Sequence, residues 1–74
     1  MLEELRKLIC EYVEVEEGDI TEDSRLMEDL GFNSFDFMGF IGEAEEHFQV
    51  AVEESEIVKV RTVKDIVEYL TSLK

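Results

Sequence analysis

The chain has 74 residues, of which 20 are acidic and 7 are basic, so its net charge at pH 7 is −13. A surface with this charge repels phosphates, which argues against nucleic acid as a partner and favours proteins with basic patches. The length makes one domain, over residues 1–74, and 45% hydrophobic residues can supply a small core, which argues against disorder.

A single cysteine, Cys10, excludes an internal disulfide and indicates a reducing compartment. The N-terminal residues 1–4, Met-Leu-Glu-Glu, lack the basic start and apolar stretch of a signal peptide, and no apolar run approaches membrane-spanning length. We therefore expect a cytoplasmic monomer without membrane insertion. The initiating methionine suggests a stand-alone protein, with a domain excised from a longer one as the alternative.

Helical spacing predicts an amphipathic helix from about residue 2 to residue 15, ended by Gly18. Its apolar positions are Leu2, Leu5, Ile9 and Val13. Residues 16–33 are mostly polar, but four apolar residues occur among them: Ile20, Leu26, Leu30 and Phe32. These predict a long structured loop held by its own side chains.

A second helix should begin near Ser34, because apolar residues then repeat with helical spacing and should face inward. They are Phe37, Ile41, Ala44 and Phe48. Residues 54–59 could form one or two helical turns. Thr62 and Asp65 resemble a capping box that opens a last helix, whose apolar stripe is Val63, Ile66, Val67, Leu70 and Leu73. We predict an all-α four-helix bundle with three longer helices and one short helix.

Residues 29–36 read Asp-Leu-Gly-Phe-Asn-Ser-Phe-Asp, in which a glycine turn delivers Ser34 to the start of an apolar helix. This segment resembles the signature of the acyl carrier protein family, which is Asp-Leu-Gly, a variable residue, Asp-Ser and an apolar residue. The resemblance extends over nearly the whole chain, through Asp23-Ser24, Glu45-Glu46, Phe48, Arg61-Thr62-Val63 and Asp65. It implies a carrier, not an enzyme, that holds acyl thioesters on a phosphopantetheine arm attached to Ser34 by a phosphopantetheinyl transferase, with coenzyme A as the source.

A phosphodiester on Ser34 would lie beside free backbone N–H groups and the positive end of the helix dipole. The simpler alternative is that Asn33 or Ser34 only caps the helix, since both residue types are favoured there. Asn33 also departs from the family, which has an aspartate at this position. The family's aspartate is thought to help the transferase and its Mg²⁺ engage the serine, so we expect slow modification or a dedicated partner enzyme.

The resemblance also implies that the second helix docks acyl-loading and acyl-transferring enzymes through their basic patches. The candidate docking residues are Phe35, Asp36, Met38, Gly39, Gly42, Glu43, Glu45 and Glu46. The alternative is an ordinary solvated face. Gly39 and Gly42 each destabilise a helix by about 1 kcal/mol relative to alanine. Either a specialised partner approaches the helix closely at these glycines, or the glycines are tolerated sequence drift. Family members commonly have an acidic residue at the position of Gly39, so its absence implies weaker or different docking.

In the family, the bundle interior can open to shelter the acyl chain. The resemblance implies lining by Phe40, Ile57, Val58, Ile66 and Val67, although the same residues would pack any small bundle.

Side-chain catalysis is poorly supported, because His47 and Cys10 lie in separate helices with no evident third partner. We expect His47 to be exposed and Cys10 to fill apolar space. A calcium-binding loop counted from Asp19 fails, since it places Ser24 where glycine is needed and Leu30 where glutamate is needed. We predict no specific metal site.

An unmodified acidic helical interaction module remains an alternative. Within the carrier class, fatty-acid, polyketide and aminoacyl or peptidyl carriers all stay open, and Asn33 and Gly39 favour a specialised one.

Overall fold

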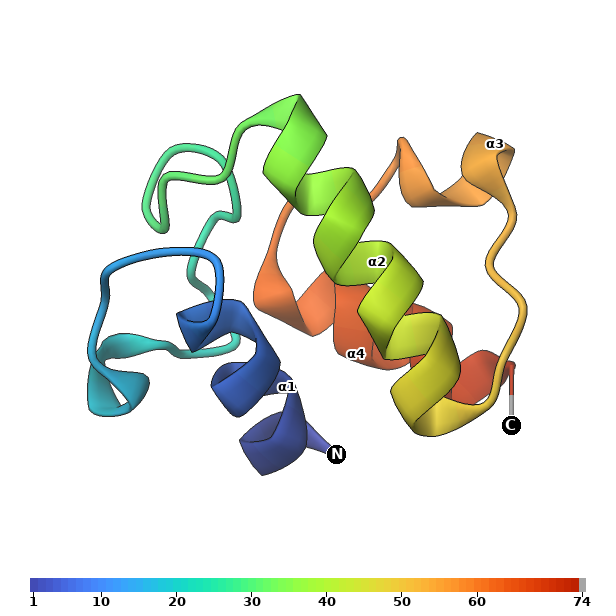
Figure 1. Ribbon diagram of the computed structural model, residues 1–74, viewed down its shortest axis with the longest axis horizontal. Helices are drawn as coiled ribbons and strands as arrows, with labels where there is room; N and C mark the ends of the chain where they lie inside the picture. The colour runs from blue at the N-terminus through green and yellow to red at the C-terminus, as the bar shows by residue number, and fades with distance from the viewer. Residues whose placement is uncertain (74) are drawn as a thin grey trace.

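The computed structural model describes residues 1–73. It contains α1 (Leu2–Cys10), a 3₁₀ turn η1 (Glu17–Asp19), α2 (Ser34–Phe48), α3 (Glu54–Ile57) and α4 (Val63–Ser72). Figure 1 shows α4 behind α2, with α1 and the long loop on one side of this pair and α3 on the other. The predicted all-α fold with three longer helices and one short helix is therefore confirmed.

The long loop between α1 and α2 is held by its own apolar side chains, as the sequence predicts. Ile20, Leu26, Leu30 and Phe32 are all buried in the core. Backbone hydrogen bonds also tie the loop to the start of α4, since the amide of Leu26 donates to the carbonyl oxygen of Arg61 over 2.9 Å. The loop is consequently a fixed support for the residues that follow it.

Helix α1 ends at Cys10, so the predicted end near residue 15 was wrong. The amides of Tyr12 and Val13 both donate to the carbonyl oxygen of Ile9, and the Cys10 thiol donates to the carbonyl oxygen of Val15 over 3.3 Å. These bonds turn the chain away from the helix axis. The apolar spacing continues past the turn because Tyr12 and Val13 still pack against the core.

Helix α4 begins with the capping box that the sequence predicts. The amide of Asp65 donates to the Thr62 hydroxyl over 3.2 Å, and the amide of Thr62 donates to the Asp65 carboxylate over 3.1 Å. Hydrogen bonds from the amides of Arg61 and Thr62 lower the pKa of Asp65, because they favour its charged form. The buried stripe is narrower than predicted, since Val67 is half-buried and Leu73 is exposed.

Candidate functional site

The loop that delivers the chain to α2 is held in place by Asp29. Its carboxylate accepts a hydrogen bond of 2.8 Å from the amide of Arg25 and also contacts the Arg25 guanidinium. This side-chain contact, followed by the bond from the Arg25 amide, lowers the pKa of Asp29. Gly31 then turns the chain with φ of 84°, a conformation that favours glycine. The buried side chains of Leu30 and Phe32 flank this turn and aim the chain into α2.

Asn33, and not Ser34, caps α2. Asn33 Oδ1 accepts a hydrogen bond of 2.7 Å from the amide of Asp36, and Asn33 Nδ2 donates to Asp36 Oδ2 over 3.3 Å. Ser34 is the first helical residue and is exposed. Within residues 1–73, its hydroxyl has no hydrogen-bond partner. Of the two capping readings, only the one for Asn33 is correct, and the Ser34 hydroxyl is left available.

The first turn of α2 has the donors that a phosphate on Ser34 needs. The cap takes the amide of Asp36, and the amide of Phe37 donates to the carbonyl oxygen of Asn33. Among the described residues, the amides of Ser34 and Phe35 have no such acceptor. Free amides and the helix dipole both favour an anion at this place. The residues present therefore fit a phosphopantetheine arm, which would supply a terminal thiol for the acyl thioester.

An apolar groove of about 240 Å³ opens beside Ser34, between α2 and α3. It is lined by Met27, Ser34, Phe37, Met38, Ile57, Val58 and Val60. Of the interior residues predicted to line an acyl site, only Ile57 and Val58 lie here. Phe40 and Ile66 are fully buried in the core. The sequence missed Met27 and Val60, because each comes from a loop whose path no periodicity reports.

The predicted docking residues share the outer side of α2, but they are not equally available. Phe35 is 86% exposed and Met38 is 46% exposed. Gly42, Glu43 and Glu46 are also exposed, whereas Asp36 is half-buried. Gly39 is exposed but lies close to the ring of Tyr12, and Glu45 is half-buried with a partner within the chain.

Glu45 is occupied by a structural role, since its carboxylate accepts a hydrogen bond of 2.9 Å from the amide of Val52. Gly39 lies under the ring of Tyr12, where an added Cβ would be 3.4 Å from a ring carbon. The Tyr12 hydroxyl bonds to Glu43, and burial followed by this bond raises the pKa of Tyr12. At 3.4 Å this Cβ would be at the edge of ordinary van der Waals contact, and Gly39 itself is exposed, so the Tyr12 ring lies beside this position without closing it off. A Cβ on Gly42 would meet no atom within 4 Å.

The side chains considered for catalysis take part in local contacts. His47 is exposed, and its Nε2 lies 2.7 Å from Glu4 Oε2 of α1. Burial, followed by the charges of Glu17 and Glu16, raises the pKa of the Cys10 thiol. Within residues 1–73, no three His, Cys, Asp or Glu side chains gather to hold a metal ion. No helix in the same range is long and apolar enough to cross a membrane.

Known proteins are similar to this chain in sequence and in fold. Residues 3–70 match the family described as "phosphopantetheine attachment site". The acyl carrier protein of Thermotoga maritima is 35% identical over 66 residues, which cover 89% of this chain and 82% of the relative. The acyl carrier protein of Aster yellows witches'-broom phytoplasma is 35% identical over 71 residues, which cover 96% of this chain and 93% of the relative.

A solved structure of the acyl carrier protein from Enterococcus faecalis has the same fold. Its TM-score is 0.85 at 26% sequence identity, and the match covers 99% of this chain and 92% of the other. Sequence, fold and the first turn of α2 therefore agree. The chain belongs to the acyl carrier protein family and is a non-enzymatic carrier of acyl groups linked through phosphopantetheine.

Proposed function

We propose that Ser34 is the residue that bears the phosphopantetheine arm. The observation that carries this proposal is an exposed hydroxyl without a hydrogen-bond partner in residues 1–73, at the first residue of α2. The capping role is already filled by Asn33, so it does not account for Ser34. The free amides of the same turn would stabilise the phosphodiester once it is formed.

The partner surface on α2 combines exposed apolar and acidic side chains. Phe35 and Met38 supply the apolar part, and Asp36, Glu43 and Glu46 supply negative charge. This surface suits the basic patches of a phosphopantetheinyl transferase and of acyl-loading and acyl-transferring enzymes. Glu45 contributes less, because its carboxylate is bound to the Val52 amide. Association should weaken with added salt.

Two positions support a specialised carrier, as opposed to a housekeeping one. Asn33 donates to Asp36, so an aspartate at position 33 would place two carboxylates side by side. Gly39 is exposed beside Tyr12 and presents no charge to a partner. An enzyme that recognises acidic residues at positions 33 and 39 would therefore bind this chain differently from a carrier that has acidic residues there. We propose that the chain works as a cytoplasmic monomer in fatty-acid or polyketide synthesis.

The test is intact-mass measurement after incubation with coenzyme A and a phosphopantetheinyl transferase. Wild type should gain the mass of one arm and Ser34→Ala should gain none. Ser55→Ala, which removes an exposed serine in α3, is the matched control and should be modified normally. Absence of modification with each of several transferases would leave the unmodified interaction module as the better reading.

The same assay tests the effect of Asn33 on recognition. We expect Asn33→Asp to be modified faster than wild type by a standard transferase, because the family's acidic residue is restored. Equal rates of modification would show that Asn33 does not distinguish this carrier from other members of the family in recognition by the transferase. Loading the modified protein with acyl-transferring or aminoacyl-transferring enzymes then separates an acyl carrier from a peptidyl carrier.

A further inference from the structure

Four aromatic rings fill the interior behind the groove at Ser34. The rings of Phe37 and Phe32 lie 5.9 Å apart, those of Phe32 and Phe40 lie 5.3 Å apart, and Tyr12 lies 6.2 Å from Phe40. Phe40 is fully buried, while Phe32 and Phe37 are nearly so. The rings therefore form a continuous row from the groove to the α1 side of the protein. We call these four residues the aromatic row.

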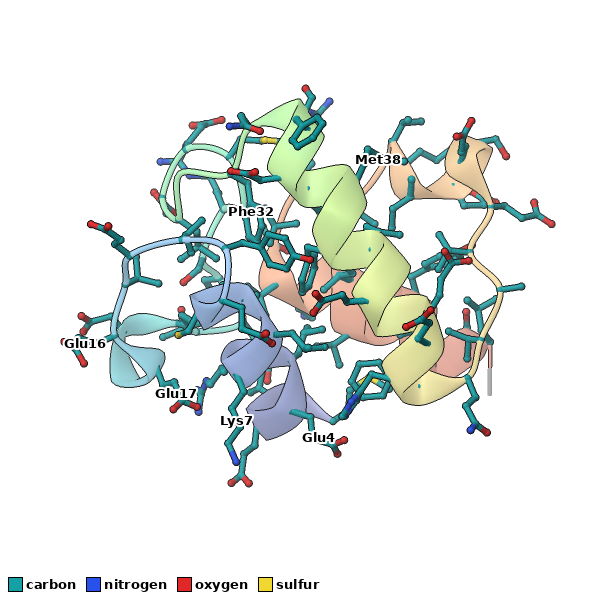
Figure 2. All side chains as sticks on the ribbon, in the orientation of Figure 1. Glu4, Lys7, Glu16, Glu17, Phe32 and Met38 are labelled. Carbon is teal, nitrogen blue, oxygen red and sulfur yellow. The ribbon has the colours of Figure 1, made fainter. Side chains whose placement is uncertain are left out.

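Figure 2 labels one ring of the aromatic row, Phe32, and one residue of the groove, Met38. Phe32 lies on the side of α2 that faces α1, and Met38 lies on the side that faces α3. Phe37 belongs to both, since it lines the groove with Met38 and contacts the ring of Phe32. Phe37 is thus the wall between the groove and the interior.

The other directions out of the groove are also filled. Ile57 lines the groove and is 1% exposed, and behind α2 the side chains of Ile41 and Ile66 are buried as well. Aliphatic side chains can shift by changing rotamers, whereas moving Phe37 breaks its contacts with two other rings. The aromatic row is consequently the stiffest part of the wall.

We propose that the aromatic row limits the length of acyl group that this carrier shelters. A cavity of about 150 Å³ takes one six-carbon benzene molecule, so the 240 Å³ groove has room for roughly ten carbon atoms. Acyl groups up to that length lie in the groove, and the tails of longer ones stay in water. The inference rests on attachment at Ser34, and it assigns Phe37 as the residue that determines the length.

The first experiment measures the thermal midpoint of the protein carrying saturated acyl groups of four to sixteen carbon atoms. We expect the midpoint to rise with each lengthening up to about ten carbons and then to stay constant, because only the sheltered part removes apolar surface from water. A midpoint that keeps rising to sixteen carbons, or that does not change at any length, would overturn the proposal.

The second experiment shortens the wall with Phe37→Leu, a substitution mild enough to preserve folding. The length at which the midpoint stops rising should increase in this variant. Phe48→Leu is the matched control, since it makes the same change at a buried position at the far end of α2. Its plateau should equal that of wild type. An unchanged plateau in Phe37→Leu would remove Phe37 from the role assigned to it.

A third experiment does not depend on the arm. In the double variant Cys10→Ala, Ser34→Cys, alkyl methanethiosulfonates of graded length attach an alkyl chain to position 34 as a disulfide and release methanesulfinate. A plateau in the thermal midpoint should appear here too, at a chain length of its own, because no arm separates the alkyl chain from position 34. If wild type accepts no arm while this variant shows the plateau, attachment at Ser34 is wrong and the groove limit stands. If the arm attaches and no plateau appears here, the groove limit alone is wrong.

Discussion

Replacing Asn33 by alanine removes the acceptor that caps α2, and Ser34→Ala removes a hydroxyl that caps nothing. The Asn33 cap is a hydrogen bond of 2.7 Å to the amide of Asp36. Losing an N-cap of this kind costs about 1 kcal/mol. In a domain of this size, that loss lowers the thermal midpoint by about 4–8 °C.

Ser34→Ala should behave differently, because Ser34 follows the cap and forms no hydrogen bond through its hydroxyl within residues 1–73. Alanine is the better helix former, so we expect the free energy of unfolding of the unmodified protein to stay within about 0.5 kcal/mol of wild type. The stability of Asn33→Asp should lie between that of Ser34→Ala and that of Asn33→Ala. Asn33→Asp keeps an acceptor for the Asp36 amide, but it replaces the bond to the Asp36 carboxylate with a repulsion that salt screens to below about 1 kcal/mol at 4 Å, which is less than the loss of the cap.

The assay is urea and thermal unfolding of the three unmodified variants beside wild type, at one salt concentration. The expected order of stability is Ser34→Ala equal to or above wild type, then Asn33→Asp, then Asn33→Ala. A loss in Ser34→Ala as large as that in Asn33→Ala would refute the reasoning. Ser34 would then be a capping residue, and its availability for an arm would lose its structural support.

Three further predictions concern stability. Gly42→Ala should raise the free energy of unfolding by about 0.5–1 kcal/mol, because alanine favours the helix and its Cβ meets no atom within 4 Å; a lower thermal midpoint would contradict this. Asp65→Asn should be less stable than wild type at pH 7. Since the folded pKa of Asp65 is lowered, the difference between the two proteins in urea unfolding should be complete above the unfolded pKa of about 3.9 and shrink as the pH falls below it; a difference that is constant down to pH 3 would contradict the role of its hydrogen bonds. Added salt or millimolar Mg²⁺ should raise the thermal midpoint by screening a net charge of −13, and a flat response to both would count against self-repulsion as a destabilising force.

The helices that pack on the core could be predicted well because local spacing reports one buried face. The stripe of α2 from Phe37 to Phe48 and the capping box of Thr62 and Asp65 both involve residues within a few turns of each other. The end of α1 could not be predicted in this way. Tyr12 and Val13 keep a helical spacing although the chain has already turned, because packing on the core requires apolar residues whether or not the backbone is helical.

The amino-acid sequence by itself determined the fold class, the charge and the serine at the start of α2, since all of these depend on composition or on residues close together in the chain. Only the tertiary structure decided which neighbour caps the helix, that the Tyr12 ring lies beside Gly39, and that Met27 and Val60 join α2 and α3 in one groove. The physical reason is that caps depend on side-chain geometry, while the groove and the aromatic row depend on contacts between segments far apart in the sequence.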